Sequence, residues 1–257
     1  MLVCGIDVGA GNVSAVILQD GDVISYCVVT SGEEGATISR KVVDEALRKT
    51  PFGFDDVQYL VATGCGRSSV PFAHRQSTEV VCQAKGALYL LPSVKTVINL
   101  GTESSRVIRI GENGKVEAFT KNDKCAAGSG LFLETMSTIL EIPVELMGNL
   151  SLESNGYEEV SSICAVFAES EVISHIHRGV SRDHILVGLH KAVADRILEI
   201  LGVANVKSDI MATGGVAKNM AIVKELEQRV GLEITVPPEP QIVGALGAAL
   251  LGQDKVS

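Results

Sequence analysis

The sequence predicts an α/β fold of two related lobes, because the same strand–turn–strand pattern opens each half of the chain. The first copy begins at Val3 and the second at Thr96, and small or polar residues occupy the tip of each hairpin. In both halves, short β-branched stretches are followed by apolar residues at helical spacing. No proline-rich or low-complexity linker divides the halves, so we expect the lobes to pack around a shared cleft.

The first half is expected to form three antiparallel strands, a helix, a further strand and a closing helix. Turn-forming residues at 7–12 and 20–22 separate the first three apolar stretches, as in consecutive hairpins. Apolar side chains then recur at 3.6-residue spacing until Pro92 ends the last helix. The expected elements are strands at 3–6, 14–18, 23–29 and 57–63 and helices at 36–49 and 79–91.

The second half repeats the hairpin and is then mostly helical. Strands are expected within 96–108, with a hairpin turn at 112–114, and a further strand within 209–216 runs into Gly214-Gly215 before a helix from Ala217 or Lys218. Helices are predicted at 130–141, 167–177, 183–201, 219–229 and 241–251. The expected domains are an N-terminal lobe at 1–94, a C-terminal lobe at 95–239 and a final helix at 240–257 that packs back near the cleft.

Composition excludes several classes of partner. The chain has 257 residues, a formal charge of −9 and a pI of about 5.1, which disfavours binding to nucleic acid. No apolar stretch reaches the ~18 residues of a spanning helix, and the N-terminus lacks a basic signal-peptide region. We therefore expect a cytoplasmic protein that does not bind membranes, whose six cysteines are reduced thiols or metal ligands.

Three glycine-rich turns predict a nucleotide site. Backbone amides approach phosphate oxygens closely where no side chain intervenes, and a carboxylate at a strand end, here Asp7, can hold hydrated Mg²⁺. An ordinary hairpin turn remains the alternative for Asp7-x-Gly9-x-Gly11 taken alone, but three such turns together favour a nucleotide. The candidate nucleotide contacts are Gly9, Ala10, Gly11, Asn12, Gly101, Thr102, Gly128, Gly130, Gly214, Gly215, Val216, Asn219 and Gln241.

Two cysteines lie where a helix is expected to begin. Cys125 precedes the predicted helix at 130–141, and Cys164 precedes the one at 167–177. Unpaired amides at a helix N-terminus stabilise a thiolate, and a cubane cluster commonly takes four thiolates. This chain offers two in that setting, so a symmetric partner would supply the others. The alternative is that each is a small buried hydrophobe, to which we assign Cys4, Cys27 and Cys82; Cys65 stays open.

The turns and the cysteine-containing runs resemble known proteins. Two phosphate hairpins followed by a Gly-Gly turn are similar to the actin, sugar-kinase and heat-shock-chaperone superfamily, which implies an actin-like ATPase (ribonuclease H-like) fold. The runs at 122–130 and 164–174 resemble more narrowly the BadF/BadG/BcrA/BcrD-type family. That family comprises the ATPase activators of 2-hydroxyacyl-CoA dehydratases and the ATP-binding subunits of benzoyl-CoA reductases.

The resemblance implies cofactors, partners and an activity. It implies one four-iron four-sulfur (4Fe-4S) cluster per dimer, held through Cys125 and Cys164 of this chain and of a second identical or related subunit. It implies binding of ATP or ADP with Mg²⁺, and ATP hydrolysis coupled to electron transfer. The electron acceptor would be a CoA-thioester dehydratase or reductase.

Departures from the family pattern leave other functions open. Asn99 stands where typical members have Asp, Ala10 where they have a small hydroxyl residue, and Ser14 where they have Lys. Asp7, Asn99 and Glu103 are the candidate catalytic residues, with Glu103 a compensating carboxylate or, alternatively, a solvated turn residue. The alternatives are a nucleotide-binding partner subunit with little hydrolysis and a small-molecule kinase of the same superfamily.

Overall fold

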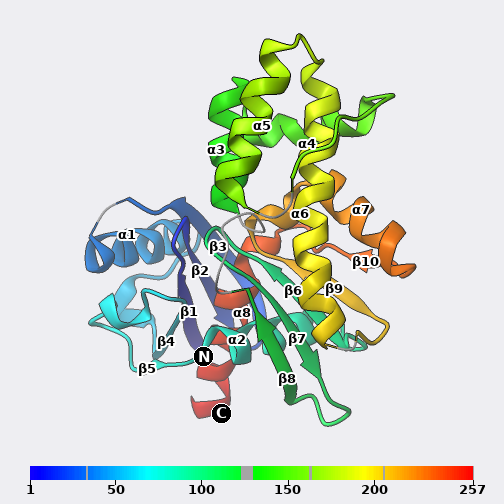
Figure 1. Cartoon of the computed structure of the whole chain (residues 1–257). Helices are drawn as coiled ribbons and strands as arrows, with labels where there is room; N and C mark the ends of the chain where they lie inside the picture. The colour runs from blue at the N-terminus through cyan, green and yellow to red at the C-terminus, as the bar shows by residue number, and fades with distance from the viewer. Residues whose placement is uncertain (33, 123–129, 162–163, 205, 257) are drawn as a thin grey trace. The chain divides into compact units, whose positions relative to one another are not determined.

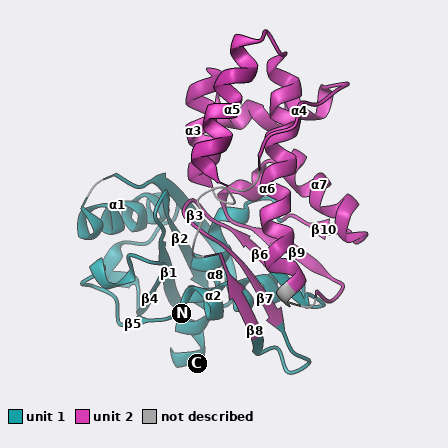
Figure 2. Ribbon diagram, viewed as in Figure 1, with its two compact units in different colours: residues 1–97, 110–117, 237–257 teal, residues 98–109, 118–236 magenta. Residues whose placement is uncertain are grey.

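The computed structural model describes residues 1–32, 34–122, 130–161, 164–204 and 206–256 (Figure 1). The chain divides into unit 1, made of Met1–Val97, Ile110–Glu117 and Pro237–Ser257, and unit 2, made of Ile98–Arg109 and Ala118–Val236 (Figure 2). Strands and helices occur in both units, which confirms the predicted α/β class.

Two five-stranded sheets have the same strand order. The first sheet runs β3-β2-β1-β4-β5. Read from β8, the second sheet runs β8-β7-β6-β9-β10. This matching order confirms that the two hairpins found in the sequence open equivalent halves. The strands are β1 (Leu2–Val8), β2 (Asn12–Gln19), β3 (Asp22–Thr30), β4 (Tyr59–Thr63), β5 (Arg75–Gln76), β6 (Thr96–Leu100), β7 (Ser105–Ile110), β8 (Val116–Lys121), β9 (Ile210–Thr213) and β10 (Ile234–Thr235).

The central strand β1 of the first sheet is buried on both faces, so it is apolar along nearly its whole length. Leu2, Cys4 and Ile6 share one core cluster with residues of α1, whereas Val3 belongs to a second cluster with Ala245 of α8. The alternation follows from the two-residue period of a strand. The helices of unit 1 are α1 (Gly35–Leu47), α2 (Glu79–Leu90) and α8 (Val243–Val256), with 3-10 turns at Phe54–Asp56, Arg67–Ser69 and Pro240–Ile242.

Glycines bring α8 against β1 and α2 at backbone contact. A Cβ at Gly5 would lie 2.0 Å from the carbonyl oxygen of Ala245, and one at Gly86 would lie 2.1 Å from that of Val243. A Cβ at Gly247 would lie 1.8 Å from the carbonyl oxygen of Cys82. Each position therefore excludes a side chain, which confirms the tight packing expected of this small-residue helix. The helix begins at Val243, not at residue 241, because residues 240–242 form a 3-10 turn.

Unit 2 is predominantly helical. Its core joins β6 and β9 to α3, α4, α5, α6 and α7 in one cluster of buried aliphatic residues with Phe132. The α-helix α4 is not predicted from the sequence, because Gly148 weakens the helical signal. The helices are α3 (Gly130–Leu140), α4 (Val144–Glu153), α5 (Ala165–His177), α6 (Arg182–Ala204) and α7 (Met220–Val230), with a 3-10 turn at Gly215–Lys218.

The prediction that a helix starts at Ala217 or Lys218 is wrong. Residues 215–218 form a 3-10 turn, and α7 begins at Met220 behind Asn219, whose backbone is extended. The Asn219 side chain accepts a hydrogen bond from the Ala221 amide at 3.2 Å, so Asn219 is the N-cap that delays the helix.

No helix within the described parts of the chain is long and apolar enough to cross a bilayer.

Candidate functional site

The first predicted phosphate turn joins β1 to β2. The Gly9 amide donates to the carbonyl oxygen of Asn12 at 2.9 Å, and a Cβ at Gly9 would lie only 2.8 Å from that oxygen. Glycine is therefore required at this position, and it leaves the turn backbone uncovered by a side chain. Ala10 is exposed at the tip, with Gly11 and Asn12 half-buried behind it.

The Asp7 carboxylate lies between two glycines of unit 1. A Cβ at Gly64 would lie 2.5 Å from Asp7 Oδ1, and a Cβ at Gly244 would lie 2.1 Å from Asp7 Oδ2. Gly64 also has a φ of +93°, which disfavours any other residue. The carboxylate thus occupies a place that side chains at residues 64 and 244 would fill.

The second phosphate turn, in unit 2, has the same geometry. The Gly101 amide donates to the carbonyl oxygen of Ser104 at 3.1 Å, and a Cβ at Gly101 would again lie 2.8 Å from the acceptor. Gly214 has a φ of +88°, and a Cβ there would lie 2.3 Å from the Leu100 carbonyl oxygen. The same distance separates a Cβ at Gly64 from the Val8 carbonyl oxygen. Gly64 and Gly214 are therefore equivalent residues.

Sequence reasoning missed the role of Gly64, although a signal was present. The tripeptide Ala-Thr-Gly occurs at 62–64, where β4 ends, and again at 212–214, where β9 ends, at equivalent places in the two sheets. Each copy brings a glycine of positive φ against the carbonyl before a phosphate turn. A search for this repeat would have added Gly64 to the candidate site.

The polar residue that precedes each turn differs between the halves. Asn99, 6% exposed, stands where the first half has Asp7. Its Nδ2 donates to Thr213 Oγ1 at 3.2 Å, and its Oδ1 accepts from Arg106 Nη1 at 3.4 Å. An amide can fill both roles because it carries a donor and an acceptor. The second turn therefore has a neutral, hydrogen-bonded group in place of a carboxylate.

Glu103 lies exposed at the tip of the second turn. Within the described residues, no hydrogen bond or ion pair joins its carboxylate to another group.

The remaining predicted nucleotide residues are spread over both units. The Gly130 and Leu131 amides at the start of α3 donate to the Gly101 and Thr102 carbonyl oxygens at 2.9 and 2.8 Å, which joins this helix to the second turn. Val216 is buried in the core of unit 2, and Gly215 begins the 3-10 turn beside it. Gly128 lies outside the described residues.

Gln241 belongs to unit 1, in the 3-10 turn before α8. Its carbonyl oxygen accepts a hydrogen bond from Ser14 Oγ at 3.3 Å. Ser14, the residue at the family's lysine position, is 3% exposed. It therefore serves the packing of β2 and provides no positive charge for a phosphate.

A buried histidine supports the segment that follows Gly214-Gly215. The Asn219 Nδ2 lies 2.9 Å from His190 Nε2 on α6, so both polar atoms of the Asn219 side chain have partners in unit 2. His190 is 2% exposed, and its Nδ1 has no hydrogen-bond partner among the described residues. Burial lowers the pKa of His190 to about 4.

This shift predicts a loss of stability in mild acid. The ordinary pKa of a histidine side chain is 6.5. Below that pH residue 190 is protonated in the unfolded chain, whereas in the folded protein buried His190 stays neutral down to about pH 4. Stability should be constant above about pH 6.5 and fall as the pH approaches 4, by at most ~3 kcal/mol. The free energy of unfolding, obtained from urea unfolding at pH 7.0 and at pH 5.0, measures this loss. His190→Gln should flatten the dependence, whereas His177→Gln, at an exposed position, should not; equal slopes in all three proteins would contradict the assignment.

Of the two predicted cluster ligands, the structure describes Cys164. It is the N-cap of α5, with a half-buried free thiol, and its carbonyl oxygen accepts from the Ala168 amide at 3.0 Å. A thiol beside the first turn of a helix suits an anionic metal–thiolate group, so this residue fits an iron–sulfur cluster. Cys125 lies outside the described residues.

The other cysteines are mostly core residues, as predicted. Cys4 and Cys82 are fully buried, and burial raises the pKa of both thiols. The Asp7 carboxylate adds to the rise at Cys82, against hydrogen bonds from Thr63 and Ser77. Cys27 is half-buried and Cys65 is exposed. The part of the chain that is described contains no group of three or more His, Cys, Asp or Glu residues placed to hold a metal ion.

Comparison with known proteins assigns the family. Residues 4–252 match the BadF/BadG/BcrA/BcrD ATPase family. The activator of lactoyl-CoA dehydratase of Anaerotignum propionicum is 40% identical over 251 residues, which is 97% of this chain and 96% of that protein. The activator of the 2-hydroxyisocaproyl-CoA dehydratase from Clostridium difficile, solved with bound ADPNP, superposes with a TM-score of 0.95 at 37% identity, over 99% of this chain and 95% of that one.

A more distant likeness bears on the fold alone. A ROK family glucokinase from Streptomyces griseus covers 99% of this chain, and this chain covers 100% of it, at a TM-score of 0.58 and 14% identity. Together with the two equivalent glycine turns, this likeness confirms the actin-like ATPase fold. The chain belongs to the BadF/BadG/BcrA/BcrD ATPase family.

Proposed function

We propose that this chain is an ATP-dependent activator that delivers low-potential electrons to a CoA-thioester dehydratase or reductase. The observation that carries the proposal is the end-to-end match with the lactoyl-CoA dehydratase activator, which covers 97% of this chain. The two equivalent turns and the position of Cys164 support it, because an activator of this kind needs a nucleotide site and a redox group.

The turns have different roles in nucleotide binding. Asp7, held between Gly64 and Gly244, would bind hydrated Mg²⁺, while the amides of the Gly9 and Gly101 turns would face phosphate oxygens. The Gly214-Gly215 turn leaves backbone open to the nucleotide. Because Asn99 is neutral and Ser14 is buried, we expect nucleotide binding with slow hydrolysis.

The redox group would be one 4Fe-4S cluster per dimer, which supplies one-electron chemistry when bound. Cys164 at the start of α5 would hold it, with Cys125 and the same two residues of a second subunit as the other ligands. Sharing the cluster makes the dimer part of the site.

Replacing either cysteine should remove the iron. In anaerobically purified protein we expect about two irons per chain, as one cubane shared by two chains requires. Cys164→Ala and Cys125→Ala should lose nearly all iron and acid-labile sulfide, because each removes half of the protein's ligands. Native mass spectrometry measures the cluster and the dimer together.

Cys27→Ala is the matched control, because Cys27 is a half-buried thiol of β3, outside the candidate cluster site. It should keep the iron of the unaltered protein. No iron in the unaltered protein, or full iron in Cys164→Ala, would refute the cluster.

A partner subunit that binds nucleotide but hardly hydrolyses it is the second candidate function. The observation that favours it is Asn99, whose amide is engaged with Thr213 and Arg106. Mixing this chain with a relative that keeps the acid in the second hairpin tests it: this function requires a heterodimer in native mass spectra and ATPase activity that follows the relative. The kinase function has no such support, since the glucokinase likeness is one of fold.

A further inference from the structure

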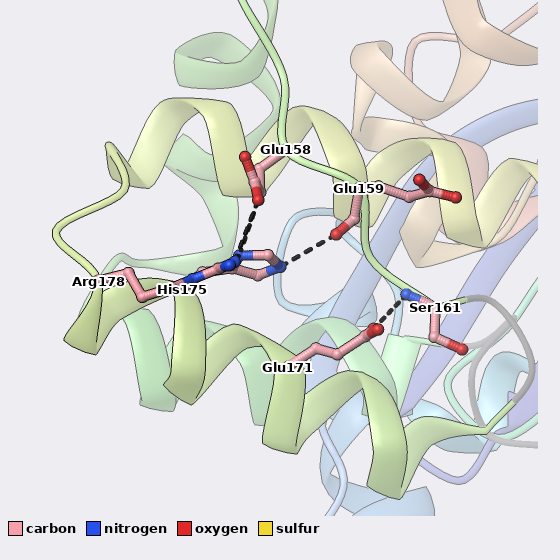
Figure 3. Close-up of polar contacts among 6 residues, drawn as sticks. All are labelled: Glu158, Glu159, Ser161, Glu171, His175 and Arg178. Atoms are coloured by element: carbon pink, nitrogen blue, oxygen red, sulfur yellow. Dashed lines mark hydrogen bonds and ion pairs between the residues drawn. The ribbon is translucent and has the colours of Figure 1, made fainter.

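Three side chains, two on one face of α5 and the third at its C-cap, Arg178, hold the segment that leads to Cys164. Glu171, His175 and Arg178 are spaced four and three residues apart, so they form one stripe along the helix. All three point toward residues 158–161 of the preceding segment (Figure 3).

His175 and Arg178 contact Glu159 and Glu158 at the start of the segment. His175 is 6% exposed; its Nε2 lies 3.0 Å from the Glu159 carbonyl oxygen, and its Nδ1 contacts Arg178 Nη2. Arg178 Nη2 also pairs with Glu158 Oε1 at 3.1 Å. The tautomer with hydrogen on Nε2 satisfies both ring nitrogens, because Nε2 then donates to the carbonyl and Nδ1 accepts from the guanidinium.

Glu171 holds the far end of the segment. Its Oε2 accepts a hydrogen bond from the Ser161 amide (Figure 3). Ser161 lies three residues before Cys164, which spans at most ~10 Å of chain. The Ser161–Glu171 hydrogen bond therefore joins the chain before Cys164 to the helix that follows it. Because the acceptor is a charged carboxylate, this hydrogen bond is stronger than one to a neutral acceptor.

The segment is also fixed against α6, so the stripe is not its only anchor. The Glu158 amide donates to the His184 carbonyl oxygen at 3.0 Å, and a Cβ at Gly188 would lie 1.9 Å from the Glu158 carbonyl oxygen. These contacts hold residue 158, whereas Glu171 holds residue 161. Beside them lies a cavity of about 740 Å³, lined in part by Glu171, His175 and Arg178.

We propose that Glu171 and His175 are positioning residues for Cys164. They fix the segment before Cys164 against the helix that begins after it, and so hold the thiol at the N-cap of α5. The inference rests on the proposed function for its consequence, which is that the stripe sets the environment of the iron–sulfur cluster. The position of the thiol itself can be measured without iron.

The test compares alkylation of Cys164 by iodoacetamide in iron-free, full-length protein, followed by peptide mass spectrometry. Glu171→Leu and His175→Leu remove the bonds and should speed alkylation by about tenfold, as expected for the loss of one charge-assisted hydrogen bond. Glu171→Gln keeps an acceptor for the Ser161 amide, and His175→Gln keeps a donor for the Glu159 carbonyl oxygen. They should speed alkylation by no more than about threefold, because a neutral hydrogen bond keeps roughly half the strength of a charge-assisted one.

Controls on the same helix separate positioning from general stability. Glu169→Leu and His177→Leu change the same residue types off the stripe and should leave the rate unchanged. Thermal unfolding of every variant checks the fold, and if His175→Leu does not fold, the two Glu171 variants decide. Equal rates for Glu171→Leu and Glu169→Leu would overturn the proposal.

A second readout addresses the cluster. In iron-loaded protein, Glu171→Leu should shift the reduction potential and the electron paramagnetic resonance spectrum, while Glu169→Leu should not. If Glu171→Leu is alkylated faster than Glu169→Leu but the unaltered protein binds no iron, the positioning of Cys164 is supported and the proposed function is refuted. An unchanged spectrum together with unchanged alkylation would overturn the positioning alone.

Discussion

Asp7→Asn is expected to lower magnesium-dependent ATP hydrolysis by about 100-fold, or ~2.7 kcal/mol of transition-state stabilisation. Asp7 is the carboxylate that Gly64 and Gly244 leave room for, and an asparagine there would keep the shape while removing the charge proposed to bind Mg²⁺. Phosphate release at saturating ATP, with Mg²⁺ varied, measures the effect. Because both side chains have nearly the same volume, the fold should be retained.

Asn99→Asp is the reciprocal variant, since Asn99 holds the equivalent position in the second turn. An aspartate there would face Arg106 and Thr213 and give the second turn the carboxylate that the first turn has in Asp7. Hydrolysis should rise, and the variant should require Mg²⁺ more strongly.

For the Asp7 prediction, the contradicting outcome is an Asp7→Asn protein that is as active as the unaltered chain, which would place the metal elsewhere.

Gly247→Ala is expected to lower the free energy of unfolding by about 3 kcal/mol or more. The added Cβ would lie 1.8 Å from the carbonyl oxygen of Cys82 and 2.6 Å from its carbonyl carbon. Both are backbone atoms of α2, so neither can rotate away, and the helices must separate. Urea unfolding at neutral pH measures the loss.

Gly202→Ala is the matched control, with the same substitution in another helix. Gly202 lies in α6, and a Cβ there would meet nothing within 4 Å. Alanine should raise stability by about 0.5–1 kcal/mol through helix propensity. Equal effects of the two substitutions would show that α2 and α8 do not touch at Gly247.

The fold and the main parts of the site follow from local sequence patterns. Two hairpins with small tips predict the equivalent sheets, because turn chemistry and strand period act over a few residues. The place of Cys164 before a helix is predicted for the same reason, and the structure makes it the N-cap of α5. The start of α7 is not predicted correctly, because Asn219 caps the helix where an uninterrupted helical pattern was read.

The sequence by itself determined the α/β class, the repeat and the glycine turns, since each depends on the type and spacing of neighbouring residues. The tertiary structure alone decided that His190 supports Asn219 and that Glu171 and His175 hold the segment before Cys164. These contacts join residues that lie on different elements. Backbone crossing and burial create them, and neither is encoded in a local pattern.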